Sequence, residues 1–335
     1  MAEVAAFRTV QIGKETTYGT EVDATIVFPV DVAQAEFSLN RAHEIPDEDF
    51  GSIHSYMAGR GSYGVRQATG SLSMQASFEL TPHVLQMAIG TPVTVAGTPA
   101  THTFTAESTS AIAKSYTFET DGSVQDWVAT GVVVTRFDIG FDAVGPGQNA
   151  MWTLNADLQA NDLAKSTATA SLSAPSPIQT MEGHLTQLYE GPAGTAFASL
   201  AELSSSLVSY RLSVECGKPG LPYGGTADKF TSIGRTKATA TVSGLVVVSS
   251  STIADLWDIY NVTGALPTDR RMRIKCSGSN SATFTIDHRV EYDDIHIDPS
   301  GREGERLLAF SAKVPYDATL ASSLQFAIQN ATASY

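Results

Sequence analysis

The sequence predicts a mainly β protein built from two tandem copies of one domain. Polar and apolar residues alternate along several stretches, as they do on strands with one buried face. Charged residues make up only 17% of the chain, below the quarter or so that is usual in globular proteins. The second half also repeats the pattern of the first, and a length of 335 residues suits about two domains.

The repeat consists of sets of matching residues whose offset falls from 175 to 170 and then to 156 positions. Matches in one order with a falling offset indicate a duplication followed by small deletions. The Ser- and Pro-rich stretch 171–177 marks the boundary, so we expect domains at residues 1–175 and 176–335. The matches are Glu15, Gly19 and Thr20 with Glu190, Gly194 and Thr195; Phe37 and Leu39 with Leu212 and Val214; Gly64, Ala68, Thr69, Leu72 and Ser73 with Gly234, Ala238, Thr239, Val242 and Ser243; and Val134, Ile139, Asp142, Gly145 and Ala156 with Val290, Ile295, Asp298, Gly301 and Ala312.

Each copy is expected to contain a strand followed by a short helix. Residues 71–80 alternate strictly between polar and apolar, which indicates a half-buried antiparallel strand. Thr81 and Pro82 then supply an N-cap and a first-turn proline, and apolar residues keep helical spacing until Gly90. The second copy repeats this order, with alternation over residues 238–242 and a helix expected within residues 251–260.

Each copy is also expected to contain a hairpin. In the first, residues 134–141 run into a turn at 145–147 and return through 152–158. In the second, residues 290–297 turn at 299–301 and return through 308–314. Residues 41–66 are rich in glycine and acidic side chains and have poor periodicity, and a segment of this length is usually functional or disordered.

Composition disfavours several classes of protein. The net charge is −14, from 21 basic and 35 acidic residues, which argues against a grip on nucleic acid phosphates. The first eleven residues contain no apolar core of a signal peptide, and the longest apolar run, Leu245 to Val248, is far shorter than the roughly 20 residues that span a bilayer. We therefore expect no membrane segment, and we expect Cys216 and Cys276 to be free thiols.

Candidate catalytic and metal sites are weak. Asp293, Asp294, His296 and Asp298 form the densest cluster of potential ligands, but their spacing does not match a calcium loop. Because the first copy has Asp142 at the matching position, we interpret Asp298 as the residue that opens a turn. No nucleophile elbow, zinc spacing, phosphate loop or dinucleotide fingerprint occurs, although a distant pair of glycosidase carboxylates would leave no such signature. We expect no enzymatic activity, no cofactor and no metal.

Residues 12–24, Ile-Gly-Lys-Glu-Thr-Thr-Tyr-Gly-Thr-Glu-Val-Asp-Ala, resemble the N-terminal signature of the major tail tube proteins of long, non-contractile-tailed (siphovirus-type) bacteriophages. The order of the predicted elements through the first half is similar to that family as well. The resemblance implies that each domain is a tail-tube-type β-sandwich or small barrel with a flanking α-helix. It also implies that rings stack into a hollow tube through which DNA passes. The matching stretch of the second half, residues 189–195, departs from the signature.

Two groups of residues are candidates for roles in such a tube. Polar strand faces that point away from the core are candidates for the channel lining, where an acidic or polar surface avoids binding DNA. The long segment 41–66 is expected to cross a subunit boundary, because its composition does not favour folding on itself. The lining candidates are Ser71, Ser73, Gln75, Ser77, Glu79, Thr153, Asn155 and Asp157, and the boundary candidates are Ile45, Asp47, Phe50, Tyr56, Arg60 and Tyr63.

The resemblance implies six tube domains per ring, so two domains per chain predict a trimeric ring with approximate six-fold symmetry. The alternative is a hexamer that carries its second domain outside. The resemblance further implies tape measure and tail terminator or tip proteins as partners, transient passage of double-stranded DNA without binding, and a place in the virion tail after assembly in the host cytoplasm. A competing hypothesis is a two-domain β-sandwich protein of the virion surface that binds the host.

Overall fold

The computed structural model describes residues 9–29, 37–44, 62–106, 114–121, 125–142, 150–170, 172–173, 175, 177–203, 207–218, 220–221, 232–234, 236–249, 256–257, 270–298 and 306–335. These residues form twenty strands and one α-helix, and eighteen of the strands are joined by ladders. The predicted mainly β class is confirmed. The helix in this part of the chain is too short and too polar to cross a membrane.

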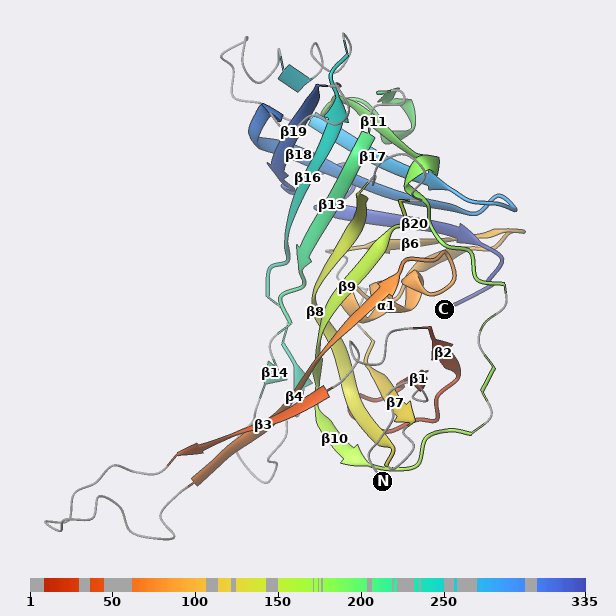
Figure 1. The fold of residues 1–335 in the computed structure, drawn as a ribbon, viewed down its shortest axis with the longest axis vertical. Helices are drawn as coiled ribbons and strands as arrows, with labels where there is room; N and C mark the ends of the chain where they lie inside the picture. The colour runs from red at the N-terminus through yellow and green to blue at the C-terminus, as the bar shows by residue number, and fades with distance from the viewer. Residues whose placement is uncertain are drawn as a thin grey trace, which may run out of the picture.

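Eight strands form one large antiparallel sheet, in the spatial order β3-β4-β9-β8-β13-β16-β19-β18. Four strands come from each half of the chain, and the ladder between β8 and β13 joins the halves. Figure 1 shows these strands running side by side along the length of the molecule. Their bounds are β3 Phe37–Glu44, β4 Ser62–Gln75, β8 Trp127–Asp142, β9 Thr153–Ala160, β13 Leu207–Glu215, β16 Thr239–Val247, β18 Thr283–Asp298 and β19 Leu307–Lys313.

Two smaller back sheets cover the large sheet, and the second of them includes two strands from the first half of the chain. The long strands β8 and β18 belong to both layers, because their first residues pair in a back sheet and their last residues pair in the large sheet. The first back sheet has the order β2-β1-β7-β8-β10, with β1 Thr9–Lys14, β2 Ile26–Phe28, β7 Tyr116–Asp121 and β10 Asp162–Lys165. The second has the order β12-β11-β17-β18-β20-β6-β5, with β5 Val93–Val95, β6 Ala100–Thr105, β11 Thr186–Pro192, β12 Ala201–Glu202, β17 Arg270–Ser277 and β20 Leu324–Asn330. A separate pair consists of β14 Gly220–Leu221 and β15 Ser232–Ile233, and short 3-10 helices cover Gly183–Leu185 and Phe197–Ser199.

The two halves use the same order of ladders, which is consistent with the predicted duplication. Both bounds of β8 recur in β18 at an offset of 156, and the ladders of β4 and β16 match at 170. The pairing of β3 differs from its sequence match. Phe37 lies opposite Gly70 and Val214 lies opposite Ala240, which makes the structural offset 177 rather than 175. A two-residue difference keeps the same side chains on the same face.

An aromatic core between the layers continues from one half into the other. Trp152 contacts Tyr210 and Phe284, with ring centroids 5.9 and 5.7 Å apart. Phe137 lies 5.9 Å from Phe326 in the same way. All of these side chains are fully buried. The halves therefore share one hydrophobic core, and Figure 1 shows β20 and β6 crossing behind β13 and β8 to close it.

The helix α1, Thr81–Ala88, lies where the sequence predicted it and begins one residue earlier than expected. Leu80 is the N-cap, and Thr81 and Pro82 already belong to the first turn. The helix C-terminus receives the buried ammonium group of Lys218 from the second half, which donates to the carbonyl oxygens of Met87, at 2.6 Å, and Ala88. A cation suits the partial negative charge at this end of a helix.

Other sequence expectations have different outcomes. The hairpins formed by β8 with β9 and by β18 with β19 are confirmed, as is strand β16. The strand predicted over residues 71–80 ends at Gln75, because the chain then turns toward α1 and bridges Thr180. The turns at 145–147 and 299–301 and most of the second helix lie outside the described residues.

The residues of the N-terminal signature have a structural role centred on Glu15. Its buried carboxylate accepts hydrogen bonds from the backbone N–H groups of Gly19 and Gly131, at 2.8 and 2.7 Å, and from the hydroxyls of Ser115 and Thr117. A buried carboxylate is tolerated when donors satisfy it in this way. In the second half, Glu190 is buried too, but its partners are Arg270 and Tyr292. Glu190 is thus a buried carboxylate like Glu15, but an arginine and a tyrosine stabilise it in place of backbone N–H groups.

The two glycines of the repeat should respond differently to replacement by alanine. Gly19 has φ of +71° and an added Cβ would lie 2.5 Å from Asn161 Nδ2, whereas nothing lies within 4 Å of the corresponding position at Gly194. We expect Gly19→Ala to cost about 1 to 3 kcal/mol and Gly194→Ala to stay within about 0.5 kcal/mol of the parent. Thermal unfolding of both variants measures this, and equal shifts would contradict the assignment.

A second prediction concerns His288, which lies in the shared core beside Tyr210, with 3.0 Å between Nε2 and the hydroxyl oxygen. Burial lowers the pKa of His288 to about 4, below the usual value near 6.5. The neutral ring therefore stabilises the fold fully above pH 6.5, and this contribution is lost as the pH falls from 6.5 toward 4, up to about 3 kcal/mol. We expect the melting temperature of His288→Gln to fall less than that of the parent over this range. Parallel pH profiles would show that His288 does not titrate as described.

Candidate functional site

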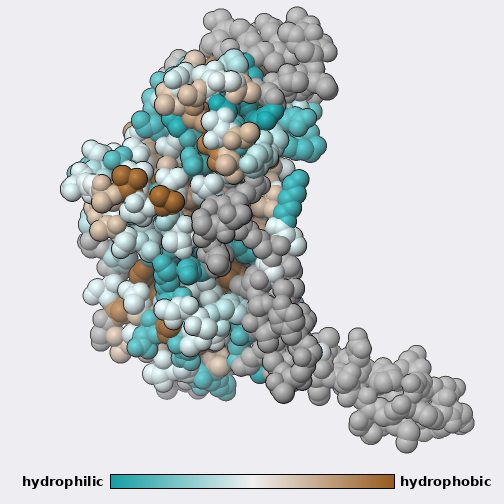
Figure 2. Space-filling model, turned by 180° about the vertical axis from the view of Figure 1, so that it is seen from behind, coloured by the Kyte–Doolittle hydropathy of each residue, from teal (hydrophilic) through white to brown (hydrophobic). Residues whose placement is uncertain are grey.

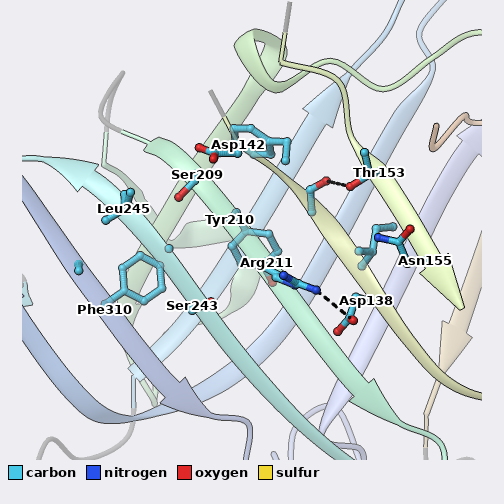
Figure 3. Close-up of a pocket in the computed structure, with 15 residues that line it drawn as sticks. Asp138, Asp142, Thr153, Asn155, Ser209, Tyr210, Arg211, Ser243, Leu245 and Phe310 are labelled. Atoms are coloured by element: carbon cyan, nitrogen blue, oxygen red, sulfur yellow. Dashed lines mark hydrogen bonds and ion pairs between the residues drawn. The ribbon is translucent and has the colours of Figure 1, made fainter. Parts of the chain in front are cut away.

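A trough of about 440 Å³ lies on the face of the large sheet that points away from the core, and it is lined by polar side chains together with Leu245, Ala309 and Phe310. Strands from both halves line it, with Asp138 and Asp142 on β8, Ser209 and Arg211 on β13, and Ser243 on β16. Figure 3 shows Arg211 reaching across the junction of the two halves toward Asp138. The alternating pattern of each strand explains the site, because the neighbouring residues Ile139 and Tyr210 turn to the core.

Six of the eight predicted lining residues share this face. The candidates on β4 and β9 lie directly opposite one another, as Ser71 with Asp157, Ser73 with Asn155, and Gln75 with Thr153. Ser73 Oγ donates to Asn155 Oδ1 at 2.6 Å. Thr153 and Asn155 line the trough itself.

The other two lining candidates do not reach this face. Ser77 is buried, and its hydroxyl accepts a hydrogen bond from the N–H of Leu80 at 3.1 Å. The carboxylate of Glu79 accepts a hydrogen bond from the N–H of Gln179 at 2.9 Å. Both residues follow the end of β4, so the alternation that assigned them to the strand continued past its true end.

The boundary candidates Ile45, Asp47, Phe50, Tyr56 and Arg60 lie outside the described residues. Tyr63 lies on β4 opposite His43. Residues 62–67 of β4 pair with β3 alone in the described part of the chain, and Figure 1 shows this two-stranded arm leaving the body of the molecule.

Ion pairs at the junction neutralise the arginine side chains of the polar face. Asp138 lies 3.2 Å from Arg211 and 3.6 Å from Arg136, and Arg136 also lies 3.4 Å from Glu215. One carboxylate therefore serves two arginines from adjacent strands. Exposed pairs such as these add little stability, so their main effect is on the charge that the face presents.

Elsewhere on this face, basic side chains also lie beside carboxylates. On β19, Lys313 Nζ lies 2.9 Å from Asp293 Oδ1, a hydrogen bond that raises the pKa of the lysine. On β18, His296 lies 2.7 Å from Asp294. Each basic residue described on this face thus has a carboxylate beside it, and further carboxylates follow the same strand faces at Asp142, Asp157, Glu291 and Asp298.

Sequence analysis did not find the residues of β8 and β13 that meet at the junction. The signal was present, since Arg136, Asp138 and Asp142 alternate with buried apolar residues, and so do Arg211 and Glu215. What the sequence lacked was evidence that these two strands are neighbours. Among the described residues, no three His, Cys, Asp or Glu side chains are grouped so as to hold a metal ion.

Seen from behind the view of Figure 1, the described surface is mostly polar. Figure 2 shows hydrophobic residues as small separate patches among hydrophilic ones. Scattered apolar residues of this kind are normal on protein surfaces.

Comparison with protein families identifies the class of protein. Residues 8–304 match the family model of the phage tail tube proteins. The chain therefore belongs to the phage tail tube protein family, as the resemblance of residues 12–24 implied, and it is a structural tail protein. No curated protein matched the chain.

The ion pairs of Asp138 lead to a prediction about DNA. Asp138→Asn removes the carboxylate that two arginines share, and we expect tighter binding of duplex DNA with a steeper salt dependence, by about one to two in the log–log slope. Asp157→Asn is the control, because it makes the same charge change on the same face, opposite Arg136 on the neighbouring strand, and leaves both ion pairs of Asp138 in place. Fluorescence anisotropy of labelled DNA across a salt series measures both. Equal DNA binding by the two variants would contradict the idea that Asp138 neutralises these two arginines.

Proposed function

We propose that three copies of this chain close into a ring, and that such rings stack into the tube of a siphovirus-type tail through which double-stranded DNA passes during ejection. The two halves act as the domains 1–175 and 176–335 of a duplicated tail tube unit. The polar face of the large sheet lines the channel, including Ser71, Ser73, Gln75, Thr153, Asn155 and Asp157.

The observation that carries this proposal is the continuity of the large sheet across both halves. The strands β3, β4, β9 and β8 are followed without a break by β13, β16, β19 and β18, in the same structural order. A sheet that repeats its own unit side by side can continue by the same step to a neighbouring chain. Closing such a sheet on itself removes its unpaired edges.

The size of the closed ring fits one DNA duplex. Three chains with eight strands each supply about 24 strands, which at about 4.8 Å spacing and a tilt near 45° give a backbone diameter of roughly 50 Å. Side chains reduce the free channel to roughly 40 Å. Six chains with all strands in one layer would double the circumference, far beyond the width of one duplex.

The alternative hexamer, with residues 176–335 as outer decoration, fits the sheet less well. Strands of the second half extend the same layer as those of the first, and their polar faces form one trough. Moving the second half outside would break the ladder of seven residue pairs between β8 and β13 and expose the core around Trp152 and Tyr210.

The electrostatics of the trough suit passage without binding. Phosphates are repelled by carboxylates and attracted by unpaired cations, and at physiological salt both effects act over only about 8 Å. A lining whose arginines are each held by a carboxylate presents DNA with no strong anchor. By family membership we further propose contacts with the tape measure and the tail terminator or tip proteins, and assembly in the host cytoplasm.

Electron microscopy of the purified protein tests the proposal directly. We expect tubes or stacked rings, and a helical reconstruction with three chains per ring and both halves lining the channel. Six chains per ring with residues 176–335 on the outside would overturn the trimer. Protein that stays monomeric under tail assembly conditions would count against tube formation itself.

A further inference from the structure

The large sheet ends in two strands that pair on one side only in the described part of the chain. At one end, β3 pairs with β4. At the other end, residues 291–298 of β18 pair with β19. Edge strands of this kind present backbone donors and acceptors to another strand.

These two ends correspond to the two strands that are joined in the middle of the chain. β18 corresponds to β8 at an offset of 156, and the first two residues of β3, Phe37 and Ser38, correspond at the ladder offset of 177 to the last two residues of β13, Val214 and Glu215. The ladder of β8 with β13 is therefore a template for a contact between β18 of one copy and β3 of another.

If this template holds, apolar residues at the two ends of the sheet should be more exposed than their counterparts at the junction of β8 and β13. Leu39 on β3 is 42% exposed, whereas its counterpart Cys216 at the junction is 6% exposed. Ile297 on β18 is 46% exposed, whereas its counterpart Phe141 is 5% exposed. The apolar residues exposed at the two ends thus occupy positions that are buried wherever the neighbouring strand is present.

A groove beside β3 provides further room for a neighbour. It has a volume of about 410 Å³ and is lined by Phe37 and Leu39 on β3 together with Phe118, Trp127 and Leu163 from the first back sheet. The groove lies on the core side of β3, which is the side where Val214, the counterpart of Phe37, is buried. Covering this apolar surface would favour association.

Resting on the proposed ring, we propose that the start of β3 in one chain pairs antiparallel with β18 of the next, with Phe37 and Ser38 taking the places that Val214 and Glu215 have beside β8. Val214 lies opposite Phe137 and Glu215 lies opposite Arg136 at the junction. Phe137 lies opposite Ala156, and Tyr292 lies opposite the matching alanine, Ala312. In the same way, Arg136 lies opposite Asp157, and Glu291 lies opposite Lys313. Tyr292 therefore takes the place of Phe137, and Glu291 takes the place of Arg136.

The transferred register makes two residue pairs. It sets Phe37 against Tyr292 on the core side and Ser38 against Glu291 on the channel side. The sequence match, with its offset of 175, would instead place Ser38 against Asp294, because Ser213 lies opposite Asp138 at the junction. The two registers therefore differ at a residue that can be tested.

Disulfide cross-linking distinguishes these pairs. Residues directly opposite on antiparallel strands have Cα atoms about 4.5 to 5.5 Å apart, within reach of a disulfide. We expect Ser38→Cys with Glu291→Cys to shift the protein, on non-reducing gels of oxidised tubes, from the mass of one chain to that of a closed set of three. Ser38 and Glu291 are both exposed in the single chain, and the native Cys216 and Cys276 are buried.

Ser38→Cys with Asp294→Cys is the matched control. The bulge between Tyr292 and Asp294 leaves Asp294 two ladder positions from Glu291, which displaces the second cysteine by about 7 Å along the strand. Each single variant controls for the native thiols. Cross-linking of the control pair alone would overturn the register, and tubes that form normally without cross-linking of either pair would overturn the strand pairing while leaving the proposed function intact. Absence of tubes from the parent protein would instead count against the proposed function.

Discussion

Backbone hydrogen bonds between β8 and β13 decide how the two halves of this chain are placed. Because side chains alternate across a strand, this ladder also decides which residues meet on each face. It brings Arg211 to Asp138 on the polar face and Tyr210 to Trp152 in the core. A slip of one residue would exchange these faces, so the trough and the shared core both depend on one register.

The halves share an architecture but compensate their buried charges differently. In the first, Glu15 is held by backbone N–H groups and hydroxyls, which requires glycines at positions of left-handed backbone. In the second, Glu190 is held by Arg270, and Arg271 and Arg273 pair with Asp317 and Asp287. Because Arg270 holds Glu190, the second half does not need glycines with left-handed backbone around this carboxylate.

The sequence predicted the strands and the helix well where periodicity was strong. The alternation of β4 and β9 identified six residues of the polar face, and capping residues placed α1 to within one residue. Alternation could not show where β4 ends, because Ser77 and Glu79 keep the pattern while bonding to local backbone. It could not show that β8 and β13 pair either, since strand neighbours 70 or so residues apart leave no local trace.

The hairpin of β5 and β6 gives the two halves of a chain a second connection behind the ladder of β8 and β13. It leaves the first half and adds to the second back sheet by pairing with β20. Between β4 and β8 the offset of the repeat falls from 170 to 156, so the second half has 14 fewer residues in the matching interval. In a ring of three such chains, junctions within a chain, which have this hairpin, would alternate with junctions between chains, which lack it. When a tail bends, strain would concentrate at the three junctions between chains, so each ring would deform there first.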